Sequence, residues 1–264
     1  MPFEQVRVVV GDTDVVPFGM TGGSRSATMT GGVTLHGARQ LKAKVIDFAS
    51  HLMEASARDL QIADGNVFVR GDPASAIPVG EVARRASSGR FGAGVDANLE
   101  VKAVFDGGEG GWSGGTHCAI VDVDIDTGIV RVERYVVAED CGTLINPAIV
   151  EGQVRGGVAQ GIGAVLLERS AYDEDGNCQS ATFMDYLVPT ACDIPRIEIE
   201  HLETVPLDTD VNFRGVGEAG MVVTPPTVVN AIEDALSPFG VRIYEQHLPP
   251  VRILELIAGA DPGR

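Results

Sequence analysis

The N-terminal part of the chain has a pattern that predicts one long helix with strands before and after it. An apolar run at 5–10 predicts a strand, and apolar side chains at helical spacing predict a helix over 32–60. This stripe belongs to a core and not to a binding site; it consists of Leu35, Ala38, Leu41, Val45, Phe48, Leu52 and Met53. Further along, 67–69 and 99–105 are predicted strands, and 77–86 is a predicted short helix.

The following segment predicts a β-hairpin and a capped helix. Apolar and polar residues alternate over 119–126 and again over 130–137, and Thr127-Gly128 between them is a turn signal. Asn146 and Pro147 are typical of the N-cap and the first position of a helix. The remaining pattern predicts a strand at 197–201, a helix from 224, a strand at 241–243 and a helix at 251–257.

The order of the elements favours an α+β fold, because no strand–helix–strand series of the parallel type is visible. We expect two mixed α/β lobes, at 1–106 and 117–264, joined by a Gly-rich linker at 107–116. Trp112 lies in this linker, where packing is the simpler interpretation and a lid or a partner contact is the alternative.

Composition and charge restrict the function classes. The 264 residues carry a formal net charge of −17, which argues against nucleic acid and anionic membranes as partners, since these bind basic surfaces. No apolar run approaches the length of a membrane span. The four cysteines form no C-x-x-C pair, so they indicate neither a zinc site nor an iron–sulfur cluster. We therefore expect a cytoplasmic protein with no nucleic acid partner and no membrane span.

A group of acidic residues in the hairpin raises the alternative of a calcium loop. Asp122, Asp124, Asp126 and Glu133 stand at the first, third, fifth and twelfth positions of such a loop. Thr127 occupies the sixth position, where a calcium loop needs glycine. Strand alternation accounts for the acids without a metal, so we reject calcium binding here.

One glutamate, Glu218, lies among small residues in the run 213–220, which reads FRGVGEAG. A carboxylate that glycines and apolar neighbours partly desolvate is a candidate general base. The run also matches the G-x-G-x-x-G dinucleotide fingerprint. That motif should follow a buried strand and open a helix directly, whereas the helix predicted here begins later, at Thr224. A surface turn with a solvated glutamate is the third interpretation.

A Gly- and Ser-rich segment near the N-terminus is a second candidate site. Its closely spaced backbone N–H groups, hydroxyls and guanidinium suit phosphate or pyrophosphate, and a helix N-terminus just after it would add a favourable dipole. A flexible loop is an equally good interpretation. The candidate binding residues are Thr21, Gly22, Gly23, Ser24, Arg25 and Ser26.

The helix after Asn146 carries five glycines, at 152, 156, 157, 161 and 163. Each internal glycine costs about 0.5–1 kcal/mol relative to alanine, so the set indicates close approach of another element or of a large ligand. Gln160 lies among these glycines and is a candidate ligand contact. A plain surface amide is the alternative.

Several of these segments, in order along the chain, resemble the molybdenum hydroxylases, the family of xanthine dehydrogenase, aldehyde oxidoreductase and aerobic carbon monoxide dehydrogenase. GVGE at 215–218 resembles the loop that carries the family's catalytic glutamate. The other matching segments are GDTD at 11–14 with Pro17 and the 21–26 loop, EDCG at 139–142, INP at 145–147, EGQ at 151–153 and QGIG at 160–163. The similarity is greatest to large subunits of the carbon-monoxide-dehydrogenase-like group.

The resemblance implies the second molybdenum-cofactor-binding domain of that family, with molybdenum–molybdopterin cytosine dinucleotide as its cofactor. The metal would be held through the pterin dithiolene, so no residue is expected to bind it directly. The 21–26 loop, Gln160 and Gly217 would bind the cofactor. Glu218 would be the catalytic base of a hydroxylase that takes its oxygen from water and oxidises an aldehyde, an N-heterocycle or a similar small molecule.

The resemblance covers only the C-terminal half of the family's large subunit. It implies three partners: the N-terminal half of that subunit, an iron–sulfur subunit and an FAD subunit, the last two carrying cofactors for which this chain has no ligands. Two alternatives stay open. One is a non-catalytic fragment, or a module that binds cofactor or partner, and the other is a nucleotide-binding oxidoreductase that uses the G-x-G-x-x-G run.

Overall fold

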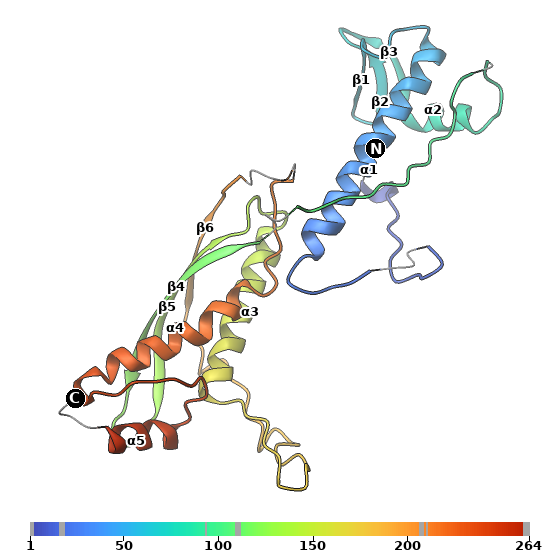
Figure 1. The fold of residues 1–264 in the computed structure, drawn as a ribbon. Coiled ribbons are helices and arrows are strands. Elements are labelled where there is room, and N and C mark those ends of the chain that lie inside the picture. The colour runs from blue at the N-terminus through green and yellow to red at the C-terminus, as the bar shows by residue number, and fades with distance from the viewer. Residues whose placement is uncertain are drawn as a thin grey trace. The chain divides into compact units, whose positions relative to one another are not determined.

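The computed structural model describes residues 3–15, 19–92, 94–108, 112–205, 209 and 211–260. Its elements form an α+β fold, as predicted (Figure 1). The chain divides into two compact units, Met1–Thr21 with Met29–Gly107 and Gly22–Thr28 with Gly108–Arg264. Gly22–Thr28, which we expected in the first lobe, thus belongs to the second unit. Pro17 of the predicted motif and 109–111 of the predicted linker lie outside the described residues.

The first unit is built on a long helix and a three-stranded antiparallel sheet. Helix α1 spans Ser26–Met53, and β1 (Leu60–Ala63), β2 (Asn66–Val69) and β3 (Asp72–Pro78) form the sheet in that order. The short helix α2 (Val79–Ala86) follows β3 directly. The buried core of the unit consists of Val45, Phe48, Ala49, Leu60, Val67, Val82 and Ala86.

Three predictions for this unit are corrected. The run at 5–10 is not a strand: a 3-10 helix, η1 (Phe3–Gln5), precedes an exposed segment that pairs with no described strand. Helix α1 begins before 32, at Ser26, and ends at Met53 because Glu54 adopts a left-handed φ of 50°. The segment 99–105 forms no strand either. A strand needs a neighbour for its backbone groups, which apolar alternation alone does not supply.

The second unit is a three-stranded sheet with helices on one face. β4 (Gly114–Val123) and β5 (Val130–Asp140) form the predicted antiparallel hairpin, and β6 (Ile197–Leu202) runs parallel to β5. Helix α3 (Pro147–Leu166) lies between β5 and β6 in the chain. The prediction that the chain has no parallel strand–helix–strand series was therefore wrong. The long segment 167–196 between α3 and β6 hides this series in the sequence.

Three helical segments complete the unit: α4 (Ala219–Ala235), the short η2 (Ser237–Phe239) and α5 (Pro250–Gly259), the last at its predicted place. Helices α3 and α4 pack side by side on the sheet (Figure 1). The fully buried core between them includes Tyr135, Val137, Val154, Val158, Ile162, Val228 and Ile232. Within the described residues no helix combines the length and the apolar composition that a membrane span needs.

Side chains explain two features of the second unit that the pattern left ambiguous. The Asp124 carboxylate accepts hydrogen bonds from the backbone N–H groups of Asp126, at 2.9 Å, and Thr127, at 3.1 Å, so it closes the hairpin turn. The strand predicted at 241–243 is absent. There the N–H of Ile243 donates to Glu233 Oε2 at 2.7 Å, and a side chain thus takes the role of a neighbouring strand.

Two glycines allow α3 and α4 to approach closely. The helix starts as predicted, with Asn146 as its N-cap. A Cβ on Gly157 would lie 2.7 Å from the backbone nitrogen of Met221, and a Cβ on Gly161 would lie 2.5 Å from Cβ of Thr224. The predicted close approach is confirmed at these two positions.

We expect Gly157→Ala to lower the free energy of unfolding by about 1–3 kcal/mol, because the added methyl group forces the two helices apart. Gly156→Ala is the matched control: it lies on the same helix with nothing described within 4 Å of its Cβ position. We expect it to be neutral or to stabilise by about 0.5–1 kcal/mol. Urea unfolding followed by circular dichroism measures both, and equal midpoints for the two variants would contradict the role of Gly157.

Candidate functional site

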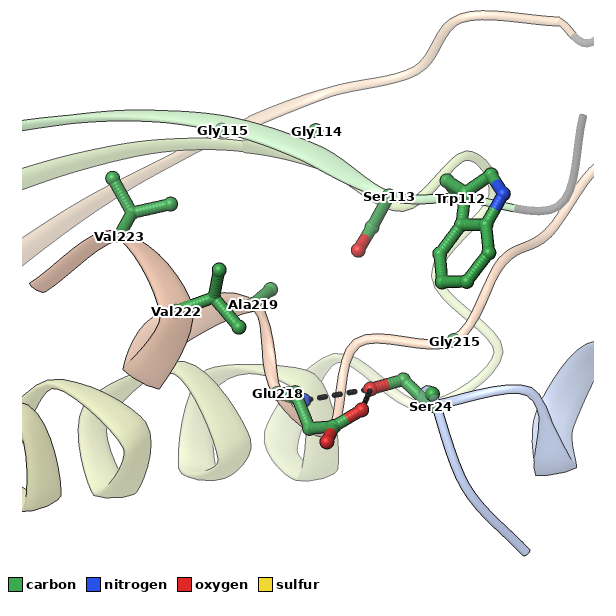
Figure 2. A pocket seen from close by; sticks show the side chains of 11 residues that line it. Ser24, Trp112, Ser113, Gly114, Gly115, Gly215, Glu218, Ala219, Val222 and Val223 are labelled. Carbon is green, nitrogen blue, oxygen red and sulfur yellow. Dashed lines mark hydrogen bonds between the residues drawn. The ribbon is translucent and has the colours of Figure 1, made fainter.

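Two segments singled out in the sequence meet in the second unit. The loop that ends at Glu218 and the Gly- and Ser-rich loop before α1 line one pocket of about 220 Å³ (Figure 2). The lining residues are Gly23, Ser24, Trp112, Ser113, Gly114, Gly115, Gly215, Glu218, Ala219, Val222 and Val223. The predicted base and part of the predicted cofactor loop therefore share one site.

Two hydrogen bonds join Ser24 and Glu218. Ser24 Oγ donates to Glu218 Oε2 at 2.8 Å, and the backbone N–H of Glu218 donates to Ser24 Oγ at 2.9 Å (Figure 2). One hydroxyl therefore fixes both the side chain and the backbone of a residue 194 positions away. Ser24 has a left-handed φ of 56°, a conformation that costs energy outside glycine and persists where the surroundings hold it.

Gly215 lets the two loops touch. A Cβ at this position would collide with the carbonyl oxygen of Ser24. Gly217 is less restricted, since its Cβ position lies 3.6 Å from Gln153 Oε1 and 3.7 Å from Ser24 Oγ, which are ordinary contact distances. Of these two glycines, Gly215 is the one at which a side chain would push Ser24 away from the loop that carries Glu218.

Helix α4 begins directly after Glu218. The predicted start at Thr224 was therefore wrong. Pro225 and Pro226 lie inside the helix, where each removes a backbone N–H. The Thr224 hydroxyl donates a hydrogen bond to the carbonyl oxygen of Gly220 at 2.7 Å. This bond to the residue four positions earlier lies within the first turn of the helix, just before the prolines. The G-x-G-x-x-G run therefore does open a helix, but no strand in the described residues leads into it, as the dinucleotide motif requires.

The surroundings of Glu218 differ from the expected partial burial. The residue is exposed. The apolar lining next to it comes from Ala219, Val222 and Val223 at the start of α4 (Figure 2). Within the described residues, orientation by Ser24 and not burial distinguishes this carboxylate.

Four other residues of the predicted cofactor loop do not line the pocket. Thr21, Gly22, Arg25 and Ser26 are all exposed. Ser26 is the first residue of α1, so a helix N-terminus follows the loop, as predicted. The loop thus places Gly23 and Ser24 at the pocket and leaves these four residues on the surface.

The predicted ligand contact Gln160 is also exposed on α3 and does not line the pocket. Gln153, two turns earlier on α3, has its amide oxygen 3.6 Å from the Cβ position of Gly217. The glutamine nearer to the Glu218 loop is therefore Gln153. The sequence offered no way to choose between them, because both lie on the same side of a helix.

Residues 112–115, which were predicted to lie in a linker, form a further wall of the pocket. The first residues of β4 lie here, and Gly114 and Gly115 line the pocket. The Trp112 ring lies 3.6 Å from the Cβ position of Gly23, yet 72% of the residue is exposed. Two glycines at the start of a predicted strand were the available signal, since they mark close approach of backbone to a neighbour.

The loop chemistry suits the phosphate-bearing group that the resemblance implies. In the first turn of α1, Thr28 Oγ1 is buried without a partner among the described residues. The N–H groups and dipole of a helix N-terminus attract anions. The pocket of about 220 Å³ is smaller than the roughly 300–1,000 Å³ of complete small-molecule sites, so a whole dinucleotide would not fit in it. No group of three or more His, Cys, Asp or Glu side chains in the described residues could hold a metal ion.

A largely buried ion pair anchors the Glu218 loop to the end of β5. Arg214 donates from Nη1 to Asp140 Oδ1 at 3.0 Å and from Nη2 to the carbonyl oxygen of Thr204 at 2.7 Å. Asp140 also accepts from the backbone N–H of Gly142 at 3.0 Å. Burial alone would raise the pKa of Asp140, but hydrogen bonds from Thr204 and Gly142 and the Arg214 charge together lower it.

Next to the pocket, ionisable side chains are buried on the helix-covered face of the sheet. Glu139 is 1% exposed, and neither of its carboxyl oxygens has a partner among the described residues. Burial, with a smaller effect from the Asp140 charge, raises the pKa of Glu139 to about 7. On β4, burial lowers the pKa of His117, and its Nε2 also lacks a described partner.

We expect Arg214→Met to lower the free energy of unfolding by about 3 kcal/mol, because it leaves the Asp140 carboxylate buried and unpaired. Arg134→Met is the matched control, since it breaks the exposed pair with Glu198, and we expect a cost of at most about 1 kcal/mol. Chemical denaturation of both variants provides the comparison. A similar cost for the two would show that the Arg214 pair is not an anchor.

We expect Glu139→Gln to be more stable, relative to the wild type, at pH 8 than at pH 5. The pKa of this carboxyl is about 7 in the fold against an ordinary value of 4.5, so the wild type loses stability as the pH rises between these values. The loss is at most about 3 kcal/mol, and glutamine, which does not ionise, removes it. Melting temperatures of both proteins at the two pH values test this. A difference between them that is independent of pH would contradict it.

Comparison with known proteins identifies the family. The family described as "Molybdopterin cofactor-binding domain" matches residues 1–195. The nicotine 6-hydroxylase large subunit of Paenarthrobacter nicotinovorans is 38% identical over 262 residues, which are 98% of this chain and 32% of that protein. The carbon monoxide dehydrogenase large chain of Afipia carboxidovorans is 34% identical over 236 residues, 89% of this chain and 29% of that one.

A solved structure shares the fold at high sequence identity. The crystal structure of quinoline 2-oxidoreductase from Pseudomonas putida 86 matches with a TM-score of 0.83 and 40% identity, over 91% of this chain and 31% of that chain. The chain thus spans about one third of the length of the relatives it matches. The resemblance to the molybdenum hydroxylases is confirmed, and the chain belongs to the molybdopterin cofactor-binding domain family.

Proposed function

We propose that this chain is the C-terminal molybdopterin-binding part of a molybdenum-dependent hydroxylase, with Glu218 as its general base. The observation that carries the proposal is the pair of hydrogen bonds between Ser24 and Glu218. These bonds join the loop that resembles the family's cofactor loop to the loop that resembles its catalytic loop. Two motifs that are far apart in the sequence thereby meet at one pocket.

The cofactor of this proposal is molybdenum–molybdopterin cytosine dinucleotide, which supplies the redox centre that accepts two electrons. The exposed N–H groups and the Arg25 guanidinium neutralise its phosphates at the N-terminus of α1. Gln160 and Gly217 contact other parts of it. The complete set of proposed cofactor-binding residues is Thr21, Gly22, Gly23, Ser24, Arg25, Ser26, Gln160 and Gly217.

Glu218 serves the reaction as a proton acceptor. Hydroxylation with water breaks one C–H bond and forms one C–O bond, and it releases two protons and two electrons. Glu218 takes one of these protons, and Ser24 keeps its carboxylate turned into the pocket by donating to Oε2. Ordinary positioned bases contribute about 10²–10⁴-fold to such reactions.

The substrate of the proposal is a small N-heterocycle. Nicotine and quinoline, which appear in the names of two relatives, both contain an aromatic nitrogen ring. Such a ring has a carbon beside its nitrogen that is open to attack by an oxygen nucleophile. An aldehyde, whose carbonyl carbon is similarly electrophilic, is the runner-up.

The partners of the proposal are the N-terminal part of the large subunit, which completes the pocket, and iron–sulfur and FAD subunits, which carry the electrons away. A non-catalytic cofactor-binding module is the second candidate function. It is favoured by the exposure of Glu218, since this carboxylate is not desolvated as a tuned general base would be. It predicts a complex that contains cofactor but does not turn over.

The test is performed on the complex purified from its own cells. We expect about one molybdenum and one cytosine nucleotide for each chain, and we expect Glu218→Gln to retain both while its kcat falls by about 10²-fold or more. Glu174→Gln, which alters an exposed glutamate in a turn outside the pocket, is the control and should keep wild-type turnover. Wild-type kcat in Glu218→Gln would exclude the base role, and absence of molybdenum would exclude the cofactor.

A further inference from the structure

A buried chain of hydrogen bonds leads from the sheet to the first turn of α4. His117 Nδ1 lies 2.9 Å from Tyr135 Oη, which lies 2.8 Å from Thr224 Oγ1. Thr224 Oγ1 lies 2.7 Å from the carbonyl oxygen of Gly220, two residues after Glu218. Tyr135 and Thr224 have no exposed surface, so water does not compete for these bonds.

The last acceptor fixes the direction of every proton in this chain. A carbonyl oxygen can only accept, so Thr224 donates to Gly220, and Tyr135 donates its single hydroxyl proton to Thr224. Tyr135 must then accept from His117, which places the imidazole proton on Nδ1. Burial lowers the pKa of His117 and favours the neutral ring, so Nε2 keeps a bare lone pair.

Glu139 is buried near Nε2 of His117, which has no partner among the described residues. Both side chains lie behind Gly115: a Cβ there would be 3.1 Å from Glu139 Oε2 and 3.7 Å from His117 Nε2. The two carboxyl oxygens and this nitrogen are all buried without partners among the described residues. A protonated carboxyl can donate one hydrogen bond. Because no direct bond joins Glu139 to His117 in the structure, a buried water would carry this donation to Nε2.

We propose that Glu139, His117, Tyr135 and Thr224 form one directional chain of hydrogen bonds that holds the first turn of α4, and with it Glu218, in place. Glu139 does not line the pocket, so it acts through the chain as a positioning residue. The functional consequence rests on the proposed role of Glu218. The hydrogen bonds themselves belong to the fold, so they can be tested without measuring enzyme turnover.

The proposed chain of hydrogen bonds is sensitive to pH at its Glu139 end. When Glu139 ionises, its carboxylate faces the Nε2 lone pair of His117, and the chain loses its terminal donor. The pKa of about 7 places this change in the neutral range. The titratable and charged groups around Glu139 are His117 on β4, its register partner His201 on β6, its chain neighbours Asp140 and Cys141, and Arg214, which pairs with Asp140.

Hydrogen exchange of the Val222, Val223 and Thr224 amides in the complex tests the proposal. In the wild type we expect their protection, corrected for intrinsic rates, to fall about fivefold between pH 6 and pH 8, as for the loss of one hydrogen bond. Glu139→Gln should remove this step, because its amide donates at every pH. If the step persists unchanged in Glu139→Gln, the proposal is overturned.

Tyrosine variants give a matched comparison. Tyr135→Phe cuts the chain, so we expect lower protection by a similar factor at both pH values and no step. Tyr244→Phe, at a side chain that is 94% exposed, should behave as the wild type. His201→Gln should keep the fall in protection between pH 6 and pH 8. Loss of this fall in His201→Gln would show that Glu139 donates to His201 and would overturn the proposal. Glu139→Gln and His201→Gln carry the test if Tyr135→Phe does not fold.

The pH profile of kcat connects the chain to function. We expect kcat of the wild-type complex to fall above pH 7 and the profile of Glu139→Gln to lack this fall, which a purely structural role would not produce. The two proposals fail separately. Wild-type turnover in Glu218→Gln would exclude the base role and leave the exchange result standing, whereas an unchanged exchange step in Glu139→Gln would exclude the chain even where Glu218→Gln is inactive.

Discussion

The close approach of α3 and α4 is the constraint on which the site depends. Gly157 and Gly220 contact each other, and a Cβ on Gly157 would lie 2.9 Å from Cα of Gly220. Helix α4 can therefore begin against the middle of α3, and Glu218 directly precedes this contact. The place of the carboxylate follows from the packing of two helices more than from its own loop, and packed interiors transmit small changes in volume.

Polar contacts then hold two loops on this helical frame. Ser24 forms hydrogen bonds with both the side chain and the backbone N–H of Glu218. Arg214 connects the same loop to Asp140 at the end of β5 through an ion pair. Behind them, Glu139 is buried although an ionised carboxylate is costly there. A buried carboxyl with a raised pKa beside a pocket is a candidate functional group, and this is the basis of the role proposed for Glu139.

Large apolar side chains are exposed around the pocket. Trp112 and Val222 line it and are 72% and 68% exposed, which is unusual for large apolar side chains. The pocket is too small for a dinucleotide, and the chain spans about one third of its relatives' length. Exposed apolar side chains beside a small pocket are typical of a surface that packs against another segment or a ligand.

The sequence alone determined the elements whose signals lie within a few residues: the β4–β5 hairpin, the Asn146 cap of α3 and the last helix. It also indicated the family, because the order of short motifs can be read directly from the sequence. Strands at 5–10 and 241–243 were predicted and did not form, since a strand depends on a partner that alternation does not specify. Only the tertiary structure decided that α4 opens after Glu218, that Ser24 holds this residue across 194 positions, and that Glu139 is buried. These features depend on contacts between segments distant in sequence, whose free energy appears only when the fold brings them together.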